Sequence, residues 1–125
     1  MHQELRLLNG EYVYKVTLGS CLSKLDKDSL VLLFKHAFDS DNNQVPQVRA
    51  HLKGGLSNVA YLKRSQQNKI VAALFFQERQ VRMHNIPSKL LSLGPLATSS
   101  DEQGKGLASL LLAETEKYAL DNNIA

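Results

Sequence analysis

The sequence has no tryptophan, one cysteine, three prolines and no long apolar stretch. The lone Cys21 has no second cysteine with which to form an internal disulfide, and no Cys-x-x-Cys pairs are present to hold zinc. The longest uninterrupted apolar segment, residues 70–76, is far shorter than the roughly 20 residues of a membrane-spanning helix. The start of the chain lacks the basic region and apolar run of a secretory signal. We therefore expect no metal site, no membrane partner and a reducing, cytoplasmic location.

Charge of one sign is not concentrated anywhere in the chain. The 15 Lys and Arg residues only slightly outnumber the 12 Asp and Glu residues, which gives a formal net charge of +3. The basic residues are scattered, and their densest group, the pair Lys63-Arg64, has no interleaved aromatic residues on which bases would stack. A nucleic-acid-binding function would rest on net charge alone, so we expect no nucleic-acid partner.

The residues that are present are typical of an ordinary globular protein. Of the 125 residues, 43% are hydrophobic and 22% are charged. A chain of this length buries enough surface to form one core without disulfides or metal ions, and it falls within the usual size range of one domain. We expect a single domain over residues 1–125.

Periodic apolar side chains predict one strand and two helices in the first half of the chain. Polar and apolar residues alternate over residues 11–18, which predicts a strand. Helical spacing predicts a helix over residues 27–38, with Asp26 as a candidate N-cap. A short second helix follows, with Pro46 in its first turn and a glycine pair at residues 54–55 to end it.

The second half of the chain predicts three strands and a long helix. The predicted elements are strands over residues 58–63, 70–76 and 90–97, a turn over residues 65–68, and a helix over residues 104–122. The middle strand is apolar on both faces and therefore belongs in the centre of a sheet. The last strand should be bulged at Gly94-Pro95, because proline has no N–H group to donate to the sheet.

The segment from Leu93 to Ala108 carries the chemistry that the sequence indicates. An apolar strand runs through a polar, glycine-containing loop directly into a helix, and the N-terminus of a helix attracts anions. Gly104 and Gly106 leave the main chain open to a phosphate, and Lys105 adds a positive charge. The alternative is that these glycines are simple turn residues.

The spacing in this loop differs from the best-known phosphate-binding motifs. Neither Gly-x-x-x-x-Gly-Lys-Ser/Thr nor Gly-x-Gly-x-x-Gly occurs. The pattern Gln103-x-x-Gly106-x-Ala108 instead resembles the Gln/Arg-x-x-Gly-x-Gly/Ala signature of the GNAT superfamily of N-acetyltransferases, and the stretch around it looks like the small predicted-acetyltransferase branch. Thr98 and Ser100 depart from that branch, which usually has valine and proline there.

The resemblance implies an α/β (α+β) fold with a mixed, mostly antiparallel central sheet flanked by helices, here cut short at the C-terminus. It also implies acetyl-CoA as co-substrate, with its diphosphate on loop amides and its pantetheine arm along the family's fourth strand, here residues 90–97. Asp101 and Glu102 would oppose the diphosphate unless they point to solvent. The residues implied in cofactor binding are Leu96, Ala97, Thr98, Gln103, Gly104, Lys105, Gly106, Leu107 and Ala108.

The activity implied by the resemblance is acetyl transfer to a primary amine of an unidentified small-molecule or peptide acceptor. A backbone N–H group near Leu96 or Ala97 would polarise the thioester carbonyl. The sequence does not identify the general base. Glu78 is a candidate, and the alternative is that it is a solvated residue beside Arg79. We expect His36 and His51 on helix surfaces and His84 in a loop that borders the substrate site.

The family's general acid is a tyrosine that follows the fifth strand, and this sequence stops before that position. The alternative function is therefore a non-catalytic module that binds CoA or a protein partner. A sheet cut short in this way would also expose the edge of its last strand, which favours pairing with a second copy as a homodimer.

Overall fold

We analysed a computed structural model of the chain. It describes residues 3–7, 10–37, 44–53, 57–65, 67, 69–102, 104, 106–122 and 124. Its elements are β1 (Gln3–Leu7), β2 (Tyr12–Leu18), α1 (Lys24–Ala37), α2 (Gln44–Lys53), β3 (Asn58–Arg64), β4 (Ile70–Met83), β5 (Ile86–Thr98) and α3 (Leu107–Asp121), with 3-10 turns at Gly19–Cys21 and Ser100–Glu102. Within these residues, no helix is both long enough and apolar enough to cross a membrane.

The described strands form one sheet in the order β1-β2-β3-β4-β5, and each strand is antiparallel to its neighbours. The predicted α+β fold, with a mostly antiparallel sheet flanked by helices, is confirmed. The sequence analysis missed β1, whose Leu5 pairs with Tyr14 of β2. This strand has only five residues and no turn signal before it, so the alternation of polar and apolar side chains is too short to identify it as a strand.

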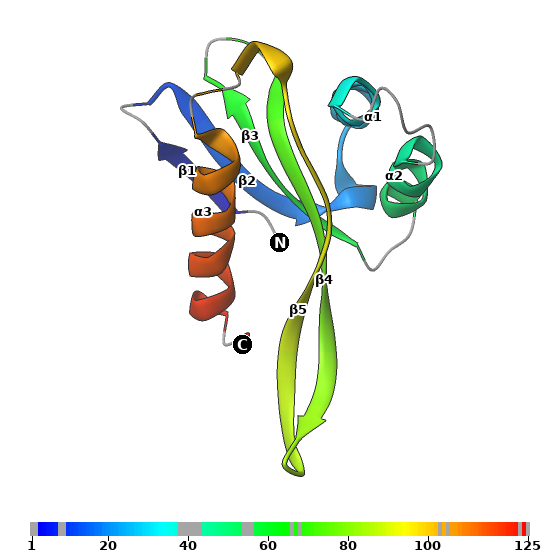
Figure 1. Ribbon diagram of the computed structural model, residues 1–125, viewed down its shortest axis with the longest axis vertical. Coiled ribbons are helices and arrows are strands. Elements are labelled where there is room, and N and C mark those ends of the chain that lie inside the picture. The colour runs from blue at the N-terminus through cyan, green and yellow to red at the C-terminus, as the bar shows by residue number, and fades with distance from the viewer. Residues whose placement is uncertain are drawn as a thin grey trace.

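The sheet separates two hydrophobic cores. Helices α1 and α2 cover one face and α3 covers the other (Figure 1). The prediction that residues 70–76 lie in the centre of the sheet is confirmed, since none of these side chains is more than 1% exposed. Alternate residues of β4 therefore enter opposite cores: Phe75 packs under α1 and α2, whereas Phe76 packs under α3.

Strands β4 and β5 continue well beyond the predicted strands as a two-stranded ribbon that projects from the sheet (Figure 1). The ladder runs from the pair Phe76–Leu93 to the pair Met83–Ile86. The turn between them consists of His84 and Asn85, which have φ angles of 51° and 63°, as a tight hairpin requires. His84 therefore lies in the turn at the tip of the ribbon, and its place beside the substrate site stays a prediction.

The predicted bulge at Gly94-Pro95 is confirmed. Leu74 pairs with Leu96 and Phe76 pairs with Leu93, so the intervening step is one residue longer on β5 than on β4. Gly94 lies against the backbone of Phe75: a Cβ atom at this position would be 3.1 Å from the Phe75 carbonyl oxygen. The bulge therefore leaves little space for a side chain at Gly94, and it accommodates Pro95, which has no N–H group to donate to the sheet.

Two helices begin at other residues than predicted. Helix α1 begins at Lys24, and the N–H group of Asp26 donates a hydrogen bond of 3.2 Å to Oγ of Ser23, so Asp26 is not the N-cap. Asp26 instead forms an ion pair of 2.9 Å with Lys63 of β3.

Helix α3 begins at Leu107 rather than at residue 104, because the backbone before it is left-handed. Pro46 lies in the first turn of α2 as predicted, and residues 54–55 lie outside the described residues.

Candidate cofactor-binding and catalytic site

The backbone between β5 and α3 is open where the anion site was predicted. Gly104 and Gly106 have φ angles of +85° and +71°, and a Cβ atom added to either would meet no other atom within 4 Å. Gly106 is the N-cap of α3 and makes no side-chain capping bond, and no acidic residue lies in the first turn. The amides of Leu107 and Ala108 have no acceptor within the helix, so this helix end can receive an anion.

The loop is attached to the sheet by the carboxylate of Glu102. This residue is only 3% exposed, so it does not point to solvent. The hydroxyl group of Tyr12 donates a hydrogen bond of 2.9 Å to Oε2, and Arg64 Nε binds Oε1. Hydrogen bonding to Glu102 raises the pKa of Arg64. The negative charge of Glu102 is therefore compensated from the sheet, and it does not oppose an anion at the loop. The side chain of Asp101 lies outside the described part of the chain.

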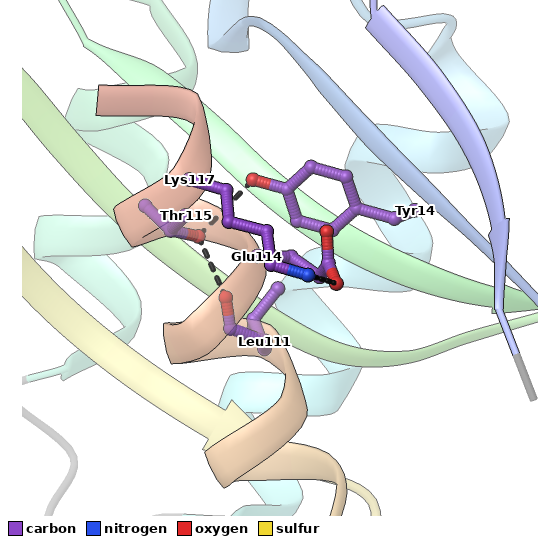
Figure 2. A network of polar contacts seen from close by, with 5 residues as sticks. All are labelled: Tyr14, Leu111, Glu114, Thr115 and Lys117. Carbon is purple, nitrogen blue, oxygen red and sulfur yellow. Dashed lines mark hydrogen bonds and ion pairs between the residues drawn. The ribbon is translucent and has the colours of Figure 1, made fainter. Parts of the chain in front are cut away.

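Helix α3 is fixed to β2 by a buried polar network (Figure 2). The Thr115 hydroxyl donates to the Leu111 carbonyl oxygen at 2.8 Å, so the Tyr14 hydroxyl, 3.1 Å from Thr115 Oγ1, is the donor in that second bond. Burial raises the pKa of Tyr14 to about 12, which keeps the phenol protonated. On the same helix, Lys117 donates to Glu114 at 3.2 Å. The Tyr14–Thr115 bond thus connects α3 to β2, and Glu102 connects the loop before α3 to the sheet.

A cavity of about 410 Å³ lies between α1 and the start of the loop. Its polar lining includes Thr98 and Ser100 from the end of β5 and the loop, His36 from α1, and Lys69 from the start of β4. Hydroxyl, imidazole and ammonium groups around one cavity suit an anionic or strongly polar ligand. Thr98, which the sequence analysis placed in the cofactor site, thus lines a cavity beside the loop.

A polar group that the sequence analysis missed lies on the α1 and α2 face beside the bulge. His51 Nδ1 is 2.8 Å from Ser57 Oγ, and Gln77 donates to the same oxygen at 3.1 Å. The imidazole stacks on Phe75, the residue opposite the bulge, with 5.0 Å between ring centroids. His51 is half-buried, so it is not the surface histidine that we had expected, and burial lowers its pKa. Its partners, Ser57 and Phe75, come from the connection after α2 and from β4, which no local pattern in the sequence predicts.

The candidate base Glu78 lies on the ribbon, two residues beyond Phe76, the last residue of β4 that pairs with β3. It is exposed and lines a hollow of about 570 Å³ together with Leu18 and Asn58, at the point where β3 no longer accompanies β4. The ring of Tyr118 is close to it: burial, and to a smaller extent the Glu78 carboxylate, raise the pKa of Tyr118. An exposed carboxylate in an open hollow is accessible to a cationic amine.

The molecule combines an antiparallel sheet, a bulged strand, a glycine-containing loop and a helix that follows this loop. Neither the protein-family models nor the curated proteins give a match to this chain. Solved structures do match. An aminoglycoside acetyltransferase from an uncultured soil metagenomic sample, in complex with sisomicin, has a TM-score of 0.69 and 18% identity over 94% of this chain and 75% of its own.

Two further acetyltransferases match over similar lengths. The ribosomal-protein-alanine N-acetyltransferase of Brucella melitensis biovar Abortus has a TM-score of 0.67 and 10% identity over 91% of this chain and 75% of its own. A GNAT family acetyltransferase of Staphylococcus aureus has a TM-score of 0.65 and 14% identity over 91% of this chain and 82% of its own. The chain has the GNAT acetyltransferase fold.

Within this GNAT fold, the structure brings some of the predicted site residues to one side of the molecule. Leu96 packs against the core under α3 and Ala97 is buried in the core under α1 and α2, so only their backbone groups lie at the sheet edge. Leu107 is also buried, which leaves its amide as the group that faces the loop. Gln103 and Lys105 lie outside the described residues.

Proposed function

We propose that this chain transfers an acetyl group from acetyl-CoA to a primary amine. Acetyl-CoA supplies an activated thioester and a diphosphate anion. The observation that carries the proposal is the open backbone at Gly104 and Gly106, followed directly by a helix N-terminus without an acidic residue or a side-chain cap. The acetyltransferase fold provides independent support. The single cysteine is an exposed thiol, which agrees with action in the reducing cytoplasm.

The backbone amides from residue 104 to Ala108 would hold the diphosphate, with Gln103 and Lys105 contributing to the same loop. Lys69 and Thr98 line the adjoining cavity and would interact with polar parts of the same ligand. Among the described strands, β5 lies at an edge of the sheet, so one side of its backbone has no neighbouring strand. The segment Leu96 to Thr98 would use that side to hydrogen-bond the pantetheine arm as an added strand does.

The chemical step needs a deprotonated amine and a polarised carbonyl group. The amine nitrogen bonds to the acetyl carbon, the C–S bond breaks, and the thiolate that leaves takes up a proton. An amide N–H group at Leu96 or Ala97 would stabilise the charge that develops on the carbonyl oxygen. Glu78 would accept the proton that the ammonium group loses, directly or through water. The bulge at Gly94-Pro95 would open the sheet edge beside this position for the thioester.

The acceptor class is a small-molecule or peptide amine. One structural neighbour is an aminoglycoside acetyltransferase in complex with sisomicin, and another is a ribosomal-protein-alanine N-acetyltransferase. Both named acceptors carry amines, and the exposed Glu78 carboxylate suits a cationic amine of either kind.

Calorimetric titration with acetyl-CoA tests the loop. Gly106→Trp places a bulky side chain in the open space at the loop, whereas Gly10→Trp is a matched control in the turn between β1 and β2. Gly10 has a φ angle of +86° and open space around it, so the backbone strain is similar. We expect Gly106→Trp to weaken binding roughly tenfold or more and Gly10→Trp to leave it unchanged. No binding by the parent chain, or equal effects of both changes, would contradict the proposal.

Turnover separates the enzyme from a non-catalytic module that binds CoA. Thiol release from acetyl-CoA is measured with a broad panel of primary amines, with hydrolysis in the absence of amine as the background. An acetyltransferase releases thiol in proportion to the acetylated product. Binding in the titration without thiol release for any amine would favour the binding module instead.

A further inference from the structure

The hollow that contains Glu78 begins where β2 and β3 stop accompanying β4. Leu18 of β2 pairs with Asn58 of β3, and Asn58 pairs with Phe76, the last residue of β4 in that ladder. Leu18, Asn58 and Gln77 line the hollow of about 570 Å³ together with Glu78. The hollow thus lies on the side of β4 that faces β3. An acceptor whose amine reaches Glu78 would contact these side chains.

The carboxamide of Gln77 is held at one end only. Its Nε2 donates a hydrogen bond of 3.1 Å to Oγ of Ser57, and within the residues that the structure describes this is the only hydrogen bond of the side chain. The two branches of an amide point in different directions, so Oε1 is turned away from Ser57. Gln77 is half-buried and lines the hollow. Its carbonyl oxygen is therefore a hydrogen-bond acceptor that a ligand in the hollow can use.

The bond between Ser57 and His51 determines which branch of the amide faces the hollow. The Ser57 side chain is buried, and its hydroxyl group has one proton. Because its oxygen accepts from Gln77, that proton is donated to His51 Nδ1, 2.8 Å away. Burial lowers the pKa of His51, which keeps the imidazole neutral and able to accept. Without this acceptor, the Ser57 proton would go to Gln77 Oε1, and the amide would turn its NH₂ group to the hollow.

The charges in the hollow determine which donor suits Gln77. Arg79 lies two residues further along β4, on the same face, and lines the same hollow. Its guanidinium group would repel a second ammonium group of the acceptor at this place. An uncharged hydroxyl or amide N–H group gains the hydrogen bond without that repulsion. Glu78 points to the opposite face and stays available for the cationic amine.

We propose that Gln77 is a specificity-determining residue whose Oε1 accepts a hydrogen bond from an uncharged hydroxyl or amide N–H group of the acceptor, and that His51 is a positioning residue that acts on Gln77 through Ser57. The inference rests on the proposed acetyl transfer and names the acceptor class, a primary amine that also carries an uncharged hydrogen-bond donor. Gln77 thus acts on acceptor binding, whereas Glu78 acts on the proton.

Matched pairs of acceptors test Gln77. Amino alcohols of increasing chain length, with the amine and the hydroxyl group at opposite ends, are compared with n-alkylamines in which a methyl group replaces the hydroxyl group. Thiol release from acetyl-CoA gives kcat/KM for each. We expect the best amino alcohol to exceed its matched alkylamine by about threefold to tenfold, mainly through a lower KM. Gln77→Met should abolish this preference and leave the kcat/KM of the alkylamine unchanged.

Gln80→Met is the matched control. Gln80 lines the same hollow and is exposed, and no described residue provides a hydrogen-bond partner for its amide. An amide that is not held loses conformational entropy when it binds a ligand, so this variant should keep the preference of the parent chain. Equal preferences in Gln77→Met and Gln80→Met would overturn the role of Gln77.

A pair of variants tests the positioning role of His51. His51→Phe keeps an aromatic ring against Phe75 but leaves the Ser57 proton to Gln77 Oε1, so the KM of the amino alcohol should rise while that of the alkylamine stays the same. Ser57→Ala added to His51→Phe removes the competing hydroxyl group and should restore part of the preference. Circular dichroism checks that each variant is folded. An unchanged preference in His51→Phe, or no recovery in the double variant, would overturn the positioning role.

NMR titration with the same amino alcohol, with and without CoA, measures binding independently of turnover. Weaker binding to Gln77→Met without thiol release from any amine would contradict the acetyl transfer and support the binding role of Gln77. Thiol release with no preference for amino alcohols in the parent chain would support the acetyl transfer and overturn the inference. A chain that neither binds an amino alcohol nor releases thiol would overturn both.

Discussion

The hydroxyl group of Tyr12 donates a hydrogen bond of 2.9 Å to Oε2 of Glu102, although 90 residues separate them in sequence. Arg64 of β3 binds the other carboxylate oxygen. Strands β2 and β3 thus each supply one partner to a buried carboxylate in the loop before α3. These contacts fix the loop before α3 to two strands of the sheet.

Replacement of Tyr12 tests the contribution of this contact. Tyr12→Phe keeps the ring but leaves the buried Glu102 carboxylate with one donor fewer. We expect the free energy of unfolding, measured by urea denaturation, to fall by about 1.5–3 kcal/mol. Tyr118→Phe is the control, because no described residue provides a hydrogen-bond partner for that half-buried hydroxyl. Equal losses for the two variants would show that Glu102 does not depend on Tyr12.

The buried phenol of Tyr14 predicts a loss of stability at high pH. Burial raises its pKa from 10.0 to about 12 in the folded chain, so the phenol ionises in the unfolded chain first. The contribution of Tyr14 to the free energy of unfolding is fully present below pH 10. It is lost as the pH rises from 10 through 12, because the unfolded chain binds fewer protons than the folded chain in this range. The full difference is roughly 3 kcal/mol. Urea denaturation across this range should show a steeper decline for the parent chain than for Tyr14→Phe. Parallel declines would contradict the assignment.

The bulge predicts a penalty for any side chain at Gly94. A methyl group there would lie 3.1 Å from the Phe75 carbonyl oxygen and 3.4 Å from its Cβ atom, in the centre of the sheet where neither can move far. We expect Gly94→Ala to lower the free energy of unfolding by about 1–3 kcal/mol, as overpacked sites do. It should also weaken acetyl-CoA binding, since β5 carries both the bulge and the segment Leu96 to Thr98. Thermal unfolding and calorimetric titration measure the two effects, and an unchanged melting temperature would refute the first.

The proposed base gives a kinetic prediction. Glu78→Gln keeps the size of the side chain but cannot accept a proton at neutral pH, so kcat should fall roughly 100-fold or more. The affinity for acetyl-CoA should stay the same, because Glu78 lies on the ribbon and away from the loop. Arg79→Gln serves as control, since successive residues of a strand point to opposite faces. If the two variants retain equal kcat values, another group accepts the proton.

Local patterns predicted those parts of the fold that depend on neighbouring residues. The apolar run at residues 70–76 indicated a central strand, and Gly94-Pro95 indicated a bulge, because burial on both faces and a missing N–H group leave direct marks in the sequence. The fold as a whole was implied by the resemblance of the loop from Gln103 to Ala108 to the signature of the GNAT superfamily. The ribbon beyond Phe76 was not predicted, because an exposed strand carries no apolar alternation.

The amino-acid sequence by itself determined the order of the elements from β2 onward, the buried central strand and the glycine positions of the loop, since each follows from side-chain period or backbone freedom within a few residues. Only the tertiary structure decided that Glu102 turns inward to Tyr12 and Arg64, and that Ser57 binds both His51 and Gln77. These groups come from different elements and connections, and the hydrogen bonds between them exist only once the sheet has assembled.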